Sequence, residues 1–335
     1  MKKLSIIILI LLLLFIAIFS YFFFRLLRYA STPASHTHKE TIVNIPLGQG
    51  LGVTAKMLYE AGIVKAPSEF RRLARIKAYD KKIRAGEYLL SPAMSPSEVL
   101  DIMAKGKVLL RKLTIPEGAS LRQIAAIVAG TGLVRESDFL KAARNTGLLH
   151  ENGIDALSPE GYLFPDTYHF SRNVTPEKIV SAMIRRFSEV FTPEWKARAR
   201  DLGFSVHEVV TLASVIEKET GAAFERPMIA SVFHNRLKKG MRLESDPTVI
   251  YGIKDFDGNI TRKHLNTYTP YNTYRIKGLP LGPIANPGKA ALEATLYPEE
   301  TQFIFFVSKD GKTHQFSSNL RDHNRAVRKY QLGKN

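Results

Sequence analysis

The sequence of 335 residues contains no cysteine. This absence excludes disulfide frameworks, thiol nucleophiles, Cys-ligated zinc sites and a lipid-modified N-terminal cysteine. Acidic residues are scarce beside basic ones, since 31 Asp and Glu stand against 48 Lys and Arg and leave a net charge of +17. Such a surplus favours an anionic partner, which could be nucleic acid, phospholipid or an acidic polymer. With 45% apolar and 24% charged residues, the composition is that of a folded globular protein.

The longest apolar run lies at the N-terminus, from Leu4 to Phe24. Its length of about 20 residues matches the hydrocarbon core of a bilayer and exceeds the apolar region of a cleaved signal peptide. We therefore expect an uncleaved transmembrane anchor, although small residues at 31–35 offer an alternative cleavage site. Lys2 and Lys3 before the run favour an N-terminus inside and the remaining chain outside. A basic domain outside the cytoplasm argues against nucleic acid as its partner.

A repeated pattern follows the anchor. Ile45-Pro46-Leu47-Gly48 and Ile115-Pro116-Glu117-Gly118 stand 70 residues apart (115 − 45). Each copy reads as a strand, a glycine turn and two helices, the second opened by Ser68 or Ser137. Residues 84–90 read as a strand that returns to complete the first copy. This βααβ order resembles the LysM-like modules of cell-wall proteins; the alternative is a spacer that packs on its neighbours.

The sequence thus predicts an α+β protein with a single transmembrane helix and two further regions. The expected layout is a cytoplasmic tip and anchor at 1–29, a linker at 30–39, LysM-like modules at 40–150 and a catalytic α+β domain at 151–335. Within the last region, a hairpin around Asp310-Gly311 and a closing helix at 320–330 are expected. His314 and His323 show no ligand spacing, so we expect structural roles for them and no metal site.

Residues 207–220 (HEVVTLASVIEKET) predict a helix that ends at Gly221. Its apolar residues form one stripe, and Glu217 falls inside that stripe at about 100° per residue. Glu217 is therefore expected to be desolvated, which favours the protonated form that a general acid needs. Glu219 lies about 200° around the helix, so the two carboxylates are not expected to converge. The alternative is that Glu217 is an ordinary helix-end charge.

Six motifs in the second half occur together in a fixed order. They are EGYLFPDTY (160–168), LASVIEKET (212–220), SVFHNRL (231–237), SDPTVIYG (245–252), YNTY (271–274) and GLPLGPIANPG (278–288). Together they resemble the YceG-like endolytic murein transglycosylase family, from the anchor to the end of the chain. The chain departs from the family pattern at Leu281, where a second proline is expected, and at His234, where an apolar or aromatic residue is common.

The resemblance implies a bacterial enzyme anchored in the cytoplasmic membrane, with its catalytic domain on the outer side. Such enzymes cleave nascent peptidoglycan strands without water and leave a 1,6-anhydro-N-acetylmuramic acid end. The resemblance places the catalytic glutamate of the ExET motif at Glu217 and implies no cofactor. Peptidoglycan is the implied partner, together with peptidoglycan synthases. The implied substrate-binding residues are Asn235, Tyr271, Asn272, Thr273 and Tyr274.

Two other classes of function stay open from the sequence. A hydrolytic muramidase would pair Glu217 with Glu219 or Asp246 and a water molecule. Asp246 is otherwise expected to cap a helix that begins at Pro247. A non-catalytic wall-binding scaffold would use the repeats alone.

Overall fold

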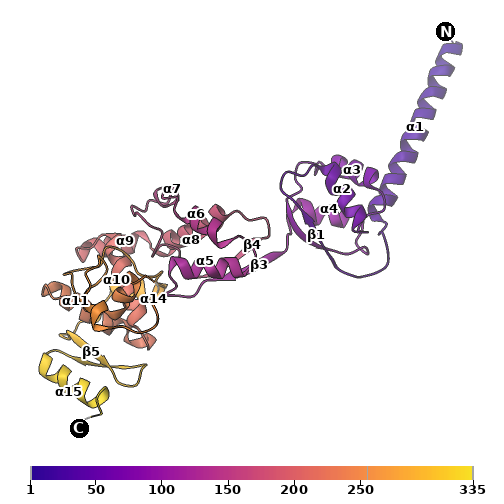
Figure 1. The fold of residues 1–335 in the computed structure, drawn as a ribbon. Coiled ribbons are helices and arrows are strands. Elements are labelled where there is room, and N and C mark those ends of the chain that lie inside the picture. Colours follow the sequence, from indigo (N-terminus) through magenta and orange to yellow (C-terminus); the bar gives the residue numbers. More distant parts are fainter. Residues whose placement is uncertain (1, 255, 334–335) are drawn as a thin grey trace. The chain divides into compact units, whose positions relative to one another are not determined.

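The computed structural model describes residues 2–254 and 256–333. The fold is α+β as predicted, with helices and three two-stranded sheets in the described residues (Figure 1). The contacts divide the chain into two compact units. One unit holds Met1–Arg111 and His169–Val174, and the other holds Lys112–Tyr168 and Thr175–Asn335.

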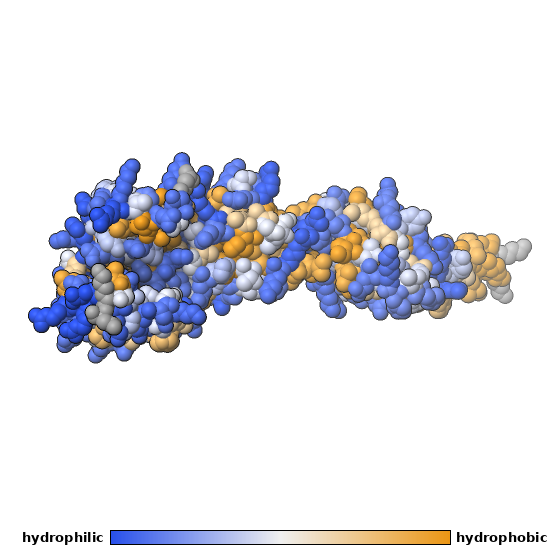
Figure 2. Space-filling model, turned by 60° about the horizontal axis from the view of Figure 1, so that its bottom comes forward, coloured by the Kyte–Doolittle hydropathy of each residue, from blue (hydrophilic) through white to orange (hydrophobic). Residues whose placement is uncertain are grey.

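Helix α1 (Lys2–Ser31) opens the first unit. Its segment Leu4–Ser31 has a mean hydropathy of 3.2 and is long and apolar enough, by length and composition alone, to cross a membrane. The apolar side chains from Leu4 to Phe24 are exposed and belong to the orange residues of the segment that carries α1 in Figure 2. Leu26, Tyr29 and Ala30, at the end of α1, pack instead against the core of the first unit. An exposed apolar run of this length is what a bilayer span requires.

The first repeat has the predicted strand–helix–helix–strand order. Its elements are β1 (Thr41–Ile45), α2 (Leu51–Glu60), α3 (Pro67–Ile76), β2 (Gly86–Leu90) and the following α4 (Pro96–Ala104). Strands β1 and β2 pair antiparallel, with Thr41 opposite Leu90 and Ile45 opposite Gly86. Helix α3 begins at Pro67 with Ala66 as its N-cap, one residue earlier than the expected start at Ser68. Proline at the first helical position is preorganised for this start.

The second repeat belongs to the second unit, apart from the strand residues at the boundary. Strand β3 (Leu110–Thr114) leads into α5 (Leu121–Gly130) and α6 (Glu136–Ala143), and β4 (Thr167–Ser171) pairs with β3. Ser120 caps α5 and forms a capping box with Gln123. Helix α6 begins at Glu136, before the expected Ser137. The division of the chain at residues 111 and 112 falls within β3, at the start of the second repeat, and the domain boundary expected after residue 150 stays a prediction.

A buried carboxylate holds the second repeat to the rest of its unit. Glu160 accepts hydrogen bonds from the backbone N–H of Leu121 at 2.9 Å, from Asn286 Nδ2 at 2.9 Å and from the Tyr251 hydroxyl at 3.1 Å. Burial raises the pKa of Glu160 to about 7, and the three donors work in the opposite direction. Asn286 also donates to the Ala119 carbonyl at 2.9 Å, so the repeat and the loop at 278–288 share one polar network.

The remaining elements of the second unit surround one central helix, α10. They are α7 (Gly147–His150), α8 (Pro176–Val190), α9 (Pro193–Asp201), α10 (Val206–Glu219), η1 (Ala223–Glu225), α11 (Arg226–Lys238), α12 (Asp246–Gly252), α13 (Arg262–Asn266), α14 (Lys289–Leu296), β5 (Phe305–Ser308), β6 (His314–Ser317) and α15 (Leu320–Tyr330). Helix α10 packs against α9, α11, α12 and α14. Ser205 caps it in a box with Glu208.

Helix α10 is buried on every side over its middle two turns, where the sequence predicted a single apolar stripe. Thr211 and Ser214 are as inaccessible as the valines beside them. Ser214 Oγ donates to the Thr211 carbonyl at 2.7 Å and accepts from Ile284 N at 3.0 Å, which satisfies this hydroxyl in the core. A helix enclosed in this way has a fixed position, so its final turn is well placed to hold functional side chains.

The backbone at Gly161 lies so close to α10 that it leaves no room for a side chain. It has a φ of +90°, and a Cβ atom there would lie 2.5 Å from Pro283 Cγ and 2.8 Å from Val210 Cγ1. We expect Gly161→Ala to lower the free energy of unfolding by about 2–4 kcal/mol, since backbone strain and overpacking both contribute. Denaturant unfolding of the purified variant measures this loss.

Gly153→Ala is the matched control, because Gly153 has a φ of +70° but no atom within 4 Å of an added Cβ. It should lose only about 1–2 kcal/mol from backbone strain. Equal losses in the free energy of unfolding of the two variants would show that overpacking against Pro283 and Val210 contributes nothing to the effect of Gly161→Ala.

Candidate active site

Two glutamates occupy the last turn of α10, and their surroundings differ. Glu217 Oε1 accepts a hydrogen bond from Arg226 Nη2 at 3.2 Å, and Glu217 Oε2 accepts one from Gly288 N at 2.9 Å. The Glu217 side chain is 6% exposed. The helical pattern thus predicted its desolvation correctly. Both oxygens, however, bind groups of the chain itself, namely the Arg226 guanidinium and the backbone N–H of Gly288.

A second carboxylate shares the same guanidinium. Glu117 Oε2 lies 3.7 Å from Arg226 Nη2, and Gly118 packs so closely that a Cβ there would lie 3.4 Å from Glu217 Cγ. Burial and the nearby Glu217 charge raise the pKa of Glu117, while Arg226 lowers it. The Ile-Pro-Glu-Gly turn of the second repeat therefore packs directly against the end of α10.

Glu219 faces a different environment. Its Oε1 atom accepts a hydrogen bond from Ser245 Oγ at 2.6 Å. Burial raises the pKa of Glu219 to about 7, the charge of Asp246 raises it further, and Ser245 and Arg236 act in the opposite direction. A carboxyl group with this pKa is partly protonated near neutral pH, which is the property a general acid needs.

Glu219 lines a pocket of about 410 Å³. The pocket is formed by the end of α10, by α11, by the segment before α12 and by the C-terminal hairpin and helix. Its lining residues are Glu219, Arg236, Leu243, Glu244, Asp246, Tyr274, Phe306, Val307, Ser308, His314, His323, Val327 and Gln331. A cavity of this size with several convergent polar groups is typical of small-molecule and sugar sites.

Arg236 and Glu244 form one wall of this pocket. Arg236 Nη1 lies 3.3 Å from Glu244 Oε2 and donates to the Leu243 carbonyl at 2.8 Å, while its Nε donates to the Ile304 carbonyl at 2.7 Å. Glu244 has a φ of +49°, a left-handed conformation that non-glycine residues seldom adopt. Backbone strain of this kind is concentrated at functional sites.

The predicted substrate-binding loop has half-buried tyrosines at both ends and two buried residues between them. Tyr274 lines the Glu219 pocket, and its hydroxyl donates to Asp246 Oδ1 at 2.7 Å. Tyr271 lies outside this lining and packs on Tyr251, with ring centroids 4.8 Å apart. Asp246 is the first residue of α12, whose N-cap is Ser245, so the expected capping role of Asp246 is wrong.

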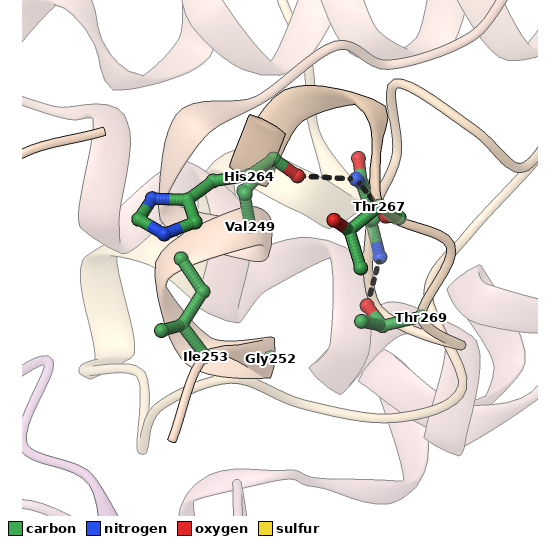
Figure 3. Close-up of a pocket in the computed structure, with 7 residues that line it drawn as sticks. Val249, Gly252, Ile253, His264, Thr267 and Thr269 are labelled. Carbon is green, nitrogen blue, oxygen red and sulfur yellow. Dashed lines mark hydrogen bonds between the residues drawn. The ribbon is translucent and has the colours of Figure 1, made fainter. Parts of the chain in front are cut away.

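Asn272 and Thr273 are buried, and their polar atoms bond within the chain. Asn272 Nδ2 donates to the carbonyls of His264, Leu265 and Thr267, beside a small pocket of about 210 Å³ whose lining Figure 3 shows. Thr273 Oγ1 bonds to Thr248 Oγ1 at 2.8 Å and accepts from Ser245 N at 3.0 Å. These internal bonds give the two residues a role in shaping the loop, and their expected contact with substrate stays a prediction.

Asn235 lies on another face of α11 from Arg236. Its Nδ2 atom donates to the carbonyls of Thr301 and Phe303 at 2.9 and 3.0 Å, and the residue lines a separate pocket of about 730 Å³. Of the six residues predicted for the site, only Tyr274 shares a pocket with Glu219. In the described part of the chain, no group of three or more His, Asp or Glu side chains is arranged to hold a metal ion.

The chain matches the model of the YceG-like family over residues 43–329. It is 33% identical over 325 residues to the endolytic murein transglycosylase of Bacillus subtilis, covering 90% of this chain and 88% of that protein. It is 29% identical to the endolytic murein transglycosylase of Streptococcus pneumoniae serotype 2, covering 88% of this chain and 59% of that protein.

A solved structure is also similar. The crystal structure of a YceG-like protein from Listeria monocytogenes matches with a TM-score of 0.60 and 34% identity, and the match covers 85% of this chain and 98% of that one. The family match spans most of the chain and includes every residue that lines the Glu219 pocket except Gln331. The chain therefore belongs to the YceG-like family.

Proposed function

We propose that this protein is a peptidoglycan lytic transglycosylase, a lyase that cuts within glycan strands. The observation that carries the proposal is a carboxyl group with a pKa of about 7, Glu219, in a polar pocket of about 410 Å³. The activity of the relatives from Bacillus subtilis and Streptococcus pneumoniae supports the same reaction. The proposed bond is the one between N-acetylmuramic acid and N-acetylglucosamine in nascent strands, so that cleavage terminates chain growth.

Glu219 is proposed as the general acid in place of Glu217. A general acid must carry a proton before the reaction and must reach the leaving oxygen. Glu219 meets the first requirement by its raised pKa and the second by its position at the pocket. Glu217 instead holds Arg226 and the backbone of Gly288, and it is not among the residues that line this pocket. We assign Glu217 to positioning the last turn of α10.

One carboxyl is sufficient for a non-hydrolytic cleavage. Glu219 would protonate the glycosidic oxygen as its bond to C1 of the muramoyl sugar breaks. The 6-oxygen of the same sugar then forms its bond to C1 as its proton leaves to a basic group of the site, which gives the 1,6-anhydro ring without water. Ordinary glycosidases need a second carboxylate as base or nucleophile, because their acceptor is a water molecule or the protein itself.

The proposed roles of the anchor and of the repeats are compatible with nascent peptidoglycan as the substrate. Helix α1 is proposed to hold the protein in the cytoplasmic membrane with the N-terminus inside, where it would act beside peptidoglycan synthases. The first repeat is proposed to be a LysM-like module that binds glycan. Its strand–helix–helix–strand order supports this proposal.

A hydrolytic muramidase is the second candidate, and one observation favours it. Asp246 lines the same pocket as Glu219, and Tyr274 holds its carboxylate in place. A carboxylate there could activate a water molecule. Mass spectrometry of digested glycan strands distinguishes the two reactions, since each hydrolysed end is one water heavier than an anhydro end. Hydrolysed ends alone would make the protein a muramidase, and no cleavage would favour a wall-binding scaffold.

The raised pKa of Glu219 predicts a pH dependence. The acid works only when protonated, so its active fraction should fall as pH rises through about 7, by about tenfold per unit beyond that value. Initial rates on purified glycan strands between about pH 5 and 9 measure this decline. A rate that stays constant up to about pH 9 would contradict a carboxyl acid with this pKa.

A further inference from the structure

A carboxylate and a histidine form a buried pair beside the Glu219 pocket. Glu225 ends η1 and is 3% exposed. Its Oε2 atom lies 2.7 Å from His314 Nδ1, and its Oε1 atom accepts the backbone N–H of His314 at 3.0 Å. Both carboxylate oxygens are thus directed to one residue at the start of β6. Since a carboxylate only accepts hydrogen bonds, Nδ1 is the donor in this pair, and within the described residues no hydrogen bond involves Nε2.

His314 is held in one orientation and lies at the pocket. Its ring meets Phe306 edge to face, with centroids 5.3 Å apart, while its Nδ1 atom is fixed by Glu225. The residue lines the same cavity as Glu219. A histidine whose one nitrogen is oriented by a buried carboxylate and whose other nitrogen is free is the arrangement that acid–base catalysis uses.

The bond to the backbone N–H holds β6 to η1, and the bond to Nδ1 fixes the orientation of the ring. The other titratable or charged groups at this cavity are Glu219 from α10, Arg236 from α11, His323 from α15, and Glu244, Asp246 and Tyr274 from the loops. Arg236 is bonded to Glu244, and Tyr274 is bonded to Asp246. In the part of the chain that the structure describes, the bonds of His314 to Glu225 use its backbone N–H and Nδ1 and not Nε2.

We propose that His314 is a second catalytic residue, the general base that takes the proton of the muramoyl 6-hydroxyl, and that Glu225 is its positioning residue. This inference rests on the proposed function. Glu219 gives its proton to the glycosidic oxygen as the bond from C1 to that oxygen breaks. The 6-oxygen forms its bond to C1 and loses its proton to His314 Nε2. The imidazolium then returns that proton to the Glu219 carboxylate, directly or through water, so atoms and charges balance over one turnover.

His314→Asn is the decisive variant. The asparagine amide can still donate to Glu225 from the place of Nδ1, but it has no atom in the place of Nε2. We expect kcat for anhydro-end formation to fall by about 10²–10⁴-fold with KM nearly unchanged, because that is the range for positioned acid–base catalysis. Glu225→Gln, which keeps His314 but loosens its orientation, should lose less and should alter the acidic side of the pH profile.

His234→Asn is the matched control. His234 is also buried and bonds through Nε2 to the Thr295 carbonyl at 2.9 Å, but it lies outside the Glu219 pocket. It should change melting temperature more than kcat. If His314→Asn fails to fold, the wild-type pH profile still tests the inference. A base and an acid acting together give a bell-shaped curve, and a rate that does not fall on the acidic side would overturn the role of His314.

The outcomes separate this inference from the proposed function. Wild-type protein that makes anhydro ends, with His314→Asn within a few-fold of it, would overturn the inference and leave the lytic reaction and Glu219 in place. Wild-type protein that makes no anhydro ends would overturn both. A lower kcat in His314→Asn with an unchanged melting temperature, together with an active His234→Asn, would support His314 as a second catalytic residue.

Discussion

Glu219→Gln should abolish cleavage while the fold and substrate binding are kept. Glutamine has the volume of glutamate and can still accept the hydrogen bond from Ser245 Oγ, but it cannot protonate the leaving oxygen. We expect kcat to fall by about 10²–10⁴-fold, the range for loss of a positioned general acid. Release of anhydro ends from purified strands measures the rate, and sedimentation with intact sacculi measures binding.

Glu217→Gln is the control on the same turn of the helix. It removes the charge that pairs with Arg226 at 3.2 Å, while the amide oxygen can still accept from Gly288. We expect a loss of about 1–3 kcal/mol in the free energy of unfolding and a smaller change in rate than Glu219→Gln produces. If Glu219→Gln keeps the wild-type turnover and Glu217→Gln is folded but inactive, then Glu217 and not Glu219 is the general acid.

Local sequence patterns were sufficient to predict the helices and strands of the first repeat. Proline, glycine and alternating apolar residues set β1, α2, α3 and β2 within about two or three residues of the observed bounds, because each of these elements is defined by its own neighbours in sequence. The C-terminal hairpin and α15 were predictable for the same reason, since Asp310-Gly311 makes the turn and α15 runs from Leu320 to Tyr330 as expected.

Local sequence patterns could not tell whether Glu217 or Glu219 is the better candidate for the general acid. A helical wheel places Glu217 among apolar residues, and the structure does bury it, but the wheel contains no information on Arg226 or Gly288. It places Glu219 about 200° from Glu217 and contains no information on the residues that enclose Glu219, because these come from distant parts of the chain. Ser245 lies 26 residues away in sequence, and the pocket also needs the C-terminal hairpin.

The YNTY segment illustrates a second limit. Its composition indicated a loop that presents polar groups, which is how Tyr274 is placed. Composition does not tell which polar groups the chain uses for itself, and the amide of Asn272 donates to two carbonyls of α13 and to that of Thr267. The same limit applies to His314, whose partner Glu225 is 89 residues away and lies on a separate element.

The extent of the catalytic domain is tested by two shortened chains that begin at residue 109 or at residue 151. The first keeps the whole second repeat, and the second begins where the sequence placed the domain boundary. We expect the chain from 109 to melt cooperatively and to cleave soluble strands. We expect the chain from 151 to be unfolded, because Ile124 and Phe139 are fully buried and their helices α5 and α6 would be missing.

The size of that effect follows from the contacts that residues 109–150 supply. Each fully buried side chain such as Ile124 or Phe139 stabilises the fold by about 1.5–3 kcal/mol, and the net stability of a domain is only about 5–15 kcal/mol. Loss of this segment also leaves Glu160 without the Leu121 donor and Asn286 without the Ala119 carbonyl, so buried polar groups lose their partners. Circular dichroism melting of both chains measures the difference. A cooperative transition and full activity in the chain from 151 would show that the second repeat is a separate module, as its likeness to the first repeat suggested.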